Sequence, residues 1–307
     1  MELYSALLTI VTSTLTSSVA LLLPALGENV SERSGVLNIG VEGYMIVGSI
    51  TSYLVYVSSG NIWLGLLMGM LAGGLLSLVH AVFSITLKCN QVICGIGIWL
   101  FGLGISGYIF RLLDITTITE KFPPCPIPLL EKIPFLGPAF FDQNIFVYIS
   151  LALVLIFSVV LSKTSWGLLN RGAGDSPFST DMAGHNVFFI RYISTFFCGL
   201  MSGLGGAYLA IGILSRFSEG MTAGRGFIAI CIVIFGGWNP WKILFGALFF
   251  SFIDSFQLYL QVWTKIPYPF LVMLPYLLTI IVVTYISRRS KNIPRKLAIP
   301  YIRGGAE

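Results

Sequence analysis

Charged residues are scarce in this chain of 307 residues. Lys, Arg, Asp and Glu together make up 10% of it, whereas a soluble globular domain carries about 25%. Hydrophobic residues make up 56%, and the mean hydropathy is +0.88. This balance excludes an ordinary soluble domain and indicates an integral membrane protein.

Common catalytic and nucleotide-binding motifs are also missing. No lysine follows a glycine, so the GxxxxGK[ST] loop that cradles nucleotide phosphates does not occur. The two histidines, His80 and His185, form no HExxH pattern, and there is no GxSxG nucleophile elbow. We therefore expect no enzymatic activity and no cofactor in this chain.

Cysteine is present at only five positions, and their spacing matches no metal-binding motif. Most lie inside or beside apolar runs, which favours buried apolar packing over disulfides or a metal site. The five are Cys89, Cys94, Cys125, Cys198 and Cys231.

Apolar runs close to the roughly 20 residues that cross a bilayer as a helix fill most of the chain. We predict an all-α, polytopic transmembrane bundle of about eight full spans plus one short or broken helix at 227–238. The first run has no basic leader or small-residue cleavage site, so we expect a retained span. With no linker in view, residues 1–307 are predicted to form one transmembrane domain. The eight long runs are 3–26, 36–57, 62–87, 92–113, 145–161, 187–214, 241–262 and 269–286.

Positive charge gathers directly after the last run, between Arg288 and Arg303. Because basic residues flank spans on the cytoplasmic side, we place the C-terminus in the cytoplasm. Counting crossings backwards, with the short run as one, puts segment 163–191 inside. The same count puts the Pro-rich loop 114–144 and the N-terminus outside. The count fails if the short run enters and leaves the membrane on the same side.

The segment 163–191 is unusually polar for this chain and reads KTSWGLLNRGAGDSPFSTDMAGHNVFFIR. Ser176 can cap a short helix, Pro177 suits its first position, and Gly184 suits the left-handed residue after its end. A short helix between two spans has little purpose in lipid. We interpret it as a docking surface for a partner in the aqueous phase.

The stretch 33–48 (RSGVLNIGVEGYMIVG) combines four glycines with Asn38 and Glu42, which lie on one helical face. Ionisable residues in a span are costly unless they pair or face a cavity, so these two are candidates for a solute path. Its glycines would permit a broken helix. The alternative is a helix start at which Glu42 reaches water or pairs with Arg33.

A second candidate opens the span after Cys89, where Asn90 and Gln91 precede Trp99 by about two helical turns. Amides beside an indole suit a planar polar solute, and they equally suit helix capping and core packing.

The third candidate is 225–241, a short apolar segment stopped by glycines and a proline, as in discontinuous helices at transport sites. In the next run Asp254, Gln257 and Gln261 follow at helical spacing. This polar stripe faces either a path or a neighbouring helix.

Small residues recur at helix-contact spacing in two further runs, a pattern that lets helix backbones approach closely in lipid. We favour packing within the chain over a subunit interface. The rows are Gly65, Gly69 and Gly73, and Gly199, Gly203 and Ala207.

These segments resemble a known family, the permease subunits of ABC importers for simple sugars, nucleosides and branched-chain amino acids. The resemblance covers about 33–240 and is carried by RSGVLNIGVEGYMIVGS, NQVICGIGI, IPFLGPAFFDQN, WGLLNRGAGDSPFSTDMAGHNV, SGLGGAYLAIG and FSEGMTAGRGFIAICIVIFGGWNP. It implies a dimer with a second, related permease, and cytoplasmic ATP-binding subunits that hydrolyse ATP. It also implies an extracytoplasmic solute-binding protein or lipoprotein, and a place in the bacterial cytoplasmic (inner) membrane.

The resemblance also assigns roles to residues. The family's coupling helix, which contacts the ATPase, maps onto 167–184; matching positions are Arg171, Asp175, Pro177, Asp181 and Gly184. The expected solute path comprises Asn38, Glu42, Tyr44, Asn90, Gln91, Trp99 and Asp254.

The chain departs from the family pattern at three places. It has Gly-Asp-Ser at 174–176 where the family commonly has Gly-Glu-Asn, Tyr44 where Gln is frequent, and Gln91 where Glu is common. A nucleoside or purine is the expected solute, with riboflavin or a simple sugar as alternatives within the same class. An ion-coupled secondary transporter is the alternative from another class.

Overall fold

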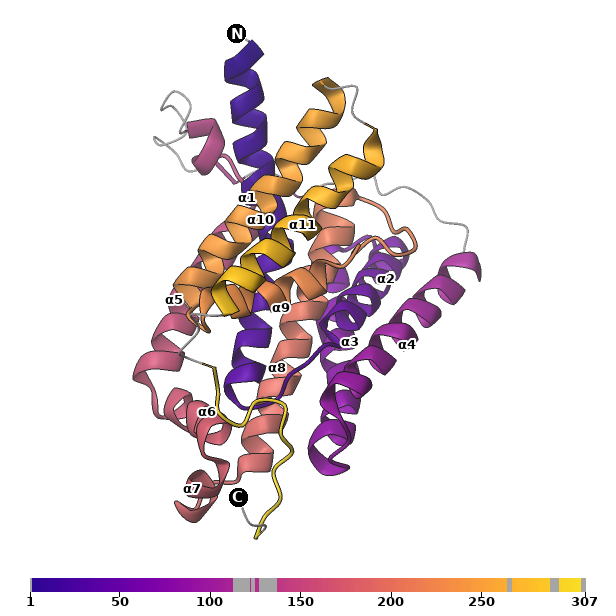
Figure 1. The fold of residues 1–307 in the computed structure, drawn as a ribbon. Coiled ribbons are helices and arrows are strands. Elements are labelled where there is room, and N and C mark those ends of the chain that lie inside the picture. Colours follow the sequence, from indigo (N-terminus) through magenta and orange to yellow (C-terminus); the bar gives the residue numbers. More distant parts are fainter. Residues whose placement is uncertain are drawn as a thin grey trace.

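The computed structural model describes residues 2–112, 122, 125–126, 137–263, 267–287 and 293–304. Within these ranges every regular element is helical, which confirms the all-α class (Figure 1). The α-helices are α1 Glu2–Arg33, α2 Val41–Ser59, α3 Ile62–Ala81, α4 Gln91–Leu112, α5 Ile145–Lys163, α6 Ser165–Asp175, α7 Pro177–Met182, α8 Val187–Ala207, α9 Arg225–Gly236, α10 Pro240–Trp263 and α11 Tyr268–Ser287. Three π-helical turns accompany them: η1 Val82–Thr86, η3 Gly137–Phe141 and η4 Tyr208–Leu214.

Six of the described helices are long and apolar enough to cross a membrane, two fewer than the eight full spans that we predict. The difference lies in α2 and α11. Helix α2 carries Glu42 and several Ser, Thr and Tyr residues, which make it less apolar than its neighbours. Helix α9 matches the predicted short run. The six are Tyr4–Arg33, Ile62–Thr86, Gln91–Leu112, Ile145–Lys163, Val187–Leu214 and Pro240–Gln261.

Helix α1 continues seven residues beyond the predicted end of the first run, and this extension matters for the site. Polar residues from Glu28 onward suggest that the span has ended, yet the helix runs to Arg33. Glu28, Asn29 and Glu32 are fully buried. Other helices of the bundle therefore surround this polar end of α1.

Helix α8 is central to the bundle and packs against α1, α2 and α3. The two rows of small residues make the α3–α8 contact: a Cβ on Gly203 would lie 2.5 Å from the Gly69 oxygen and 3.0 Å from the Gly73 Cα. Such backbone proximity leaves no room for a side chain. The prediction that these rows pack within one chain is confirmed.

This contact gives a first testable prediction. Gly203→Ala would drive a methyl group into the α3 backbone, and overpacking of this kind costs about 1–3 kcal/mol. We expect a lower melting temperature of the permease in detergent. Gly104→Ala is the matched control, because a Cβ at Gly104 meets nothing within 4 Å. Equal melting temperatures for the two variants would contradict the packing.

The cysteine prediction is only partly right. Cys198 is buried in α8, and Cys94 and Cys231 are half-buried. The expectation of burial is wrong for Cys89 and Cys125, which are exposed because both lie outside the helices.

The predicted outer loop 114–144 falls largely outside the described residues. Of the parts that are described, Phe122 packs edge-on against Phe146 of α5 at 5.1 Å and against Trp63 of α3 at 5.8 Å. The prediction that this loop lies outside the cell stays a prediction.

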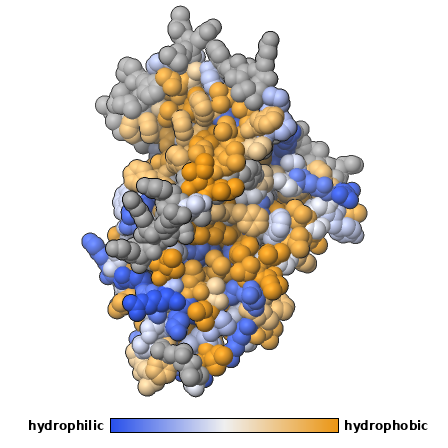
Figure 2. All heavy atoms as spheres, viewed as in Figure 1, coloured by the Kyte–Doolittle hydropathy of each residue, from blue (hydrophilic) through white to orange (hydrophobic). Residues whose placement is uncertain are grey.

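Apolar side chains cover much of the bundle in the face shown by Figure 2, and hydrophilic residues gather in a band in its lower half and again at its right in the upper half. The lower band lies at about the level of α6 in Figure 1. This amphipathic distribution suits a bundle embedded in lipid with its α6–α7 end in water.

Candidate coupling surface and solute path

The polar segment 163–191 folds into two short helices at one end of the bundle (Figure 1). Thr164 caps α6 by accepting a hydrogen bond from the Gly167 N–H at 3.2 Å. Pro177 is the first residue of α7, and Gly184 follows its end with φ +86°. These features confirm the predicted short helix. Ser176 holds the N-cap position, but its hydroxyl meets the Ser179 hydroxyl at 2.7 Å instead of a backbone N–H.

Large apolar side chains are exposed on and around these two helices. Leu168 of α6 is 64% exposed and Met182 of α7 is 73% exposed. Phe178 of α7 and Phe189 in the first turn of α8 are also exposed. Large apolar side chains that are exposed on short helices and at the start of a span are typical of a surface that another protein covers. We call Leu168, Phe178, Met182 and Phe189 the apolar knob.

The charged residues expected on the coupling surface have partners within the chain. The Asp175 carboxylate accepts from the backbone N–H of Arg295 at 3.3 Å. Asp181 accepts from Arg303 at 2.8 and 2.9 Å and from the Tyr301 hydroxyl at 3.0 Å. Arg171 is half-buried and donates to the Gly167 oxygen at 3.3 Å, within its own helix.

These donors, Arg303 first, lower the pKa of the Asp181 carboxyl. A carboxylate with a lowered pKa contributes its stabilisation above its unfolded pKa and loses it as pH falls through the lowered value. The contacts of Asp181 are therefore fully formed at neutral pH.

Arg191, in α8, is a buried residue that the sequence interpretation did not single out. Its guanidinium donates to the carbonyls of Ser34, Ala173 and Ile299 at 3.1, 3.2 and 3.0 Å. Ser34 follows the C-terminus of α1 and Ala173 lies in the last turn of α6. The cation thus meets the negative ends of two helices. The only sequence signal was a single basic residue in the first turns of an apolar span.

Glu42, in the first turn of α2, packs against the start of α9, where its carboxylate accepts three hydrogen bonds. The donors are the Thr222 hydroxyl at 2.6 Å, the Gly224 N–H at 2.8 Å and the Gly226 N–H at 2.6 Å. The side chain is buried and holds the N-terminus of the short helix. The alternative of a Glu42–Arg33 pair is wrong, because Arg33 donates to the Trp238 carbonyl.

Asn38 and Tyr44 lie together in a buried polar cluster. The Tyr44 hydroxyl donates to the Asn38 side chain at 2.8 Å, and the Asn38 N–H donates to Glu28 at 2.9 Å. Cys198 donates to the other Glu28 oxygen at 3.1 Å. Glu28 was missed because it follows the apparent end of the first run, although an acid so close to a span was itself a signal.

The two amides at the start of α4 have different surroundings. Gln91 is buried and accepts from the Leu37 N–H at 2.9 Å, next to Asn38. Asn90 is exposed and caps α4 by accepting from two backbone N–H groups, as the capping alternative expects. Trp99 is half-buried, and its ring meets the Phe227 ring edge-on at 5.2 Å. Gln91 therefore joins the Asn38 region and Asn90 does not.

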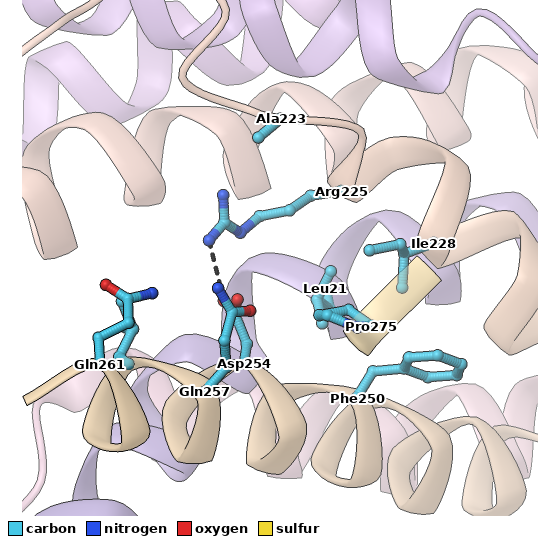
Figure 3. A pocket seen from close by; sticks show the side chains of 10 residues that line it. Leu21, Ala223, Arg225, Ile228, Phe250, Asp254, Gln257, Gln261 and Pro275 are labelled. Carbon is cyan, nitrogen blue, oxygen red and sulfur yellow. Dashed lines mark hydrogen bonds and ion pairs between the residues drawn. The ribbon is translucent and has the colours of Figure 1, made fainter. Parts of the chain in front are cut away.

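Asp254 lines a cavity of about 200 Å³ between α1, α9, α10 and α11 (Figure 3). Arg225, the first residue of α9, pairs with Asp254 at 3.0 Å. Gln257 and Gln261 of α10 line the same cavity, and the Gln261 amide nitrogen has no partner in the part of the chain that is described. The start of α9 thus lies between Glu42 on one side and Asp254 on the other.

The chain is similar in sequence to a family of permeases and to several curated relatives. The family described as branched-chain amino acid transport system / permease component matches residues 10–283. A guanosine ABC transporter permease protein of Bacillus subtilis is 38% identical over 99% of both chains. A putative glucose ABC transporter permease protein of Haloferax volcanii is 34% identical over 94% of both, and a nucleoside ABC transporter permease protein of Lactococcus lactis is 31% identical over 99% of both.

No solved structure matches the chain significantly. Three observations agree: a family match over most of the length, a helical bundle whose described part has six helices long and apolar enough to cross a membrane, and a pair of short helices at one end. The chain belongs to the family of branched-chain amino acid transport system permease components.

Proposed function

We propose that this chain is the membrane permease subunit of an ATP-driven importer of nucleosides. The observation that carries the proposal is the full-length similarity to the guanosine permease, at 38% identity. A separate ATP-binding subunit would supply the energy, since the chain has no phosphate-cradling loop. An extracytoplasmic solute-binding protein or lipoprotein would deliver the solute.

The apolar knob is the proposed contact with the ATP-binding subunit. Its four apolar side chains are exposed, whereas the charged residues Asp175 and Asp181 of the same segment are hydrogen-bonded to other parts of this chain. This assignment requires the α6–α7 end and the C-terminus to lie in the cytoplasm, and the N-terminus outside. Because only differential affinity shifts a two-state equilibrium, the knob would contact the ATPase differently in the outward-open and inward-open states.

The proposed solute path runs beside the start of α9. Glu42 and Asp254 meet α9 from two sides, and the Arg225 guanidinium and the Gln257 and Gln261 amides offer hydrogen bonds toward a cavity. Side-chain amides in a cavity with apolar walls can form hydrogen bonds with the polar edges of a nucleobase, while the walls contact its ring. We propose that the path is completed at the contact with a second, related permease.

Membrane topology gives a second prediction. A Met182→Cys variant of a permease lacking its natural cysteines should react with a membrane-impermeant maleimide only when the cytoplasmic side is open to the reagent. Met182 is 73% exposed, so access is not limited by the fold. Labelling of intact cells would place the knob outside and contradict the proposed coupling.

A third prediction concerns the solute. In vesicles that contain the complete complex, unlabelled guanosine should block uptake of labelled adenosine or guanosine, and glucose should not. A simple sugar is the second candidate, favoured by the 34% identity to the putative glucose permease. Uptake of labelled glucose that guanosine leaves unchanged would support the sugar and overturn the nucleoside.

A further inference from the structure

Residues 293–304, which follow the last helix, lie across the α6–α7 end of the molecule. In Figure 1 this yellow segment runs beside α6 toward α7. The described segment contains no helix, and it is held by contacts to several other elements. We call residues 293–304 the C-terminal strap.

Backbone contacts fix the first half of the strap. The Lys296 N–H donates to the Gly174 oxygen at 2.9 Å, and the Ala298 N–H donates to the Gly35 oxygen at 3.1 Å. A Cβ on Gly174 would lie 3.0 Å from the Gly35 nitrogen, so α6 and the end of α1 already touch there. The strap thus crosses a tight junction between two helices.

Arg191 anchors the middle of the strap from inside. The same guanidinium binds the Ile299 carbonyl of the strap, the Ser34 carbonyl after α1 and the Ala173 carbonyl of α6. Because the side chain is buried and its donors are divided among three segments, none of these segments can shift alone without leaving a buried donor unpaired.

Side chains fix the last part of the strap to α7. Tyr301 is buried, its ring lies 5.6 Å from the Phe188 ring, and its hydroxyl donates to Asp181. Arg303 approaches the same carboxylate with two nitrogens. The acidic residue of α7 is therefore held by the strap of its own chain.

We propose that the C-terminal strap is the mechanical link that passes movement of α7 to the segment 34–40, with Arg191 as a positioning residue. One end of the link is Asp181 in α7, and the other is Gly35. Three residues beyond Gly35 lies Asn38, which bonds to Glu28 and Tyr44 in the buried cluster. This inference rests on the proposed function, because it assigns α7 to the ATPase contact.

The sizes of the expected effects follow from the kinds of contact. Arg303 is 71% exposed, and exposed ion pairs contribute little. Removing its charge should therefore weaken the link only about two- to fivefold. Replacing the whole strap removes the backbone bonds, the Arg191 contact to Ile299 and the Asp181 contacts together, and we expect a loss of about tenfold or more.

The test measures nucleoside moved per ATP hydrolysed by the complete complex in vesicles. Replacing residues 293–304 with Gly-Ser repeats of equal length should lower this ratio about tenfold while hydrolysis continues. Arg303→Gln should lower the ratio about two- to fivefold. The double variant Asp181→Arg with Arg303→Asp, which exchanges the two charges, should recover part of the ratio that Arg303→Gln loses. Lys296→Gln is the matched control, because it removes one positive charge from the strap but leaves the backbone bond to Gly174.

An unchanged ratio after strap replacement would overturn the proposal, as would equal losses in Arg303→Gln and Lys296→Gln. If strap replacement prevents folding, judged by size-exclusion in detergent, the Arg303 and Lys296 variants still decide. Failure of the unmodified complex to import would count against the proposed function instead. In that case, a bifunctional maleimide is applied to the permease alone, without its natural cysteines and with new cysteines at 175 and 295. These positions adjoin the backbone bond between Lys296 and Gly174, which the substitutions leave in place, and absence of a crosslink overturns the strap contact.

Discussion

Replacing Met182 with aspartate is expected to abolish ATP-dependent uptake while leaving a folded permease in the membrane. The side chain is 73% exposed at the end of α7, so the new charge is solvated when the permease is alone. In a complex it would be buried in an apolar contact, and an unpaired charge at the centre of an interface costs several kcal/mol, on the order of 2–5. We expect the ATP-binding subunit to stop co-purifying.

The control for this variant adds the same charge elsewhere. Ser59 is exposed at the C-terminal end of α2, outside the coupling segment, and Ser59→Asp should leave both co-purification and uptake unchanged. If Met182→Asp retained the ATP-binding subunit and normal uptake, the apolar knob would not be the docking surface.

Replacing Glu42 with alanine is expected to reduce uptake by more than tenfold. The change removes the acceptor of three hydrogen bonds and leaves two N–H groups and a hydroxyl at the start of α9 without their partner. Each unsatisfied buried group costs about 1–3 kcal/mol, so the helix start should shift. Arg225 and its pairing with Asp254 would shift with it.

Glu219→Ala is the matched control for Glu42→Ala, because it removes a carboxylate that is exposed and paired with an exposed arginine. Its effect on uptake should be less than twofold, as expected of a surface ion pair. Uptake is measured at equal amounts of folded permease. Normal uptake by Glu42→Ala would show that the start of α9 has no part in the path.

The sequence predicts local features of this fold well where a single residue decides the backbone. Pro177 and Gly184 mark the two ends of α7, and both lie where their backbone preferences place them. The glycine rows likewise predict close packing within the chain, and the structure shows that the two rows pack against each other, α3 against α8.

Long-range partners could not be read from the sequence in the same way. Nothing in the sequence around Glu42 indicates that its carboxylate accepts hydrogen bonds from the N–H groups of Gly224 and Gly226, which are more than 180 residues away. The same holds for Asp181 and Arg303, which are 122 positions apart. Pattern reasoning identifies which polar residues are unusual in a span, and the tertiary packing determines what they bind.

The end of α1 lies beyond the point that the hydropathy pattern predicts. Hydropathy falls after Leu26 and predicts that the span ends there, yet α1 continues and Glu28, Asn29 and Glu32 are buried by neighbouring helices. A helix surrounded by protein can carry polar residues that a helix facing lipid cannot. The polarity of this segment reflects its place in the bundle. Hydropathy alone does not distinguish a helix end that is surrounded by protein from a helix end that has left the membrane.

Transport with and without the ATP-binding subunit tests the central claim most directly. Purified permease in vesicles with an imposed proton or sodium gradient should accumulate no labelled guanosine. Adding the ATP-binding subunit, a related second permease, the solute-binding protein and ATP should start accumulation. Accumulation by this chain alone under an ion gradient would contradict the account, because the chain would then be an ion-coupled carrier.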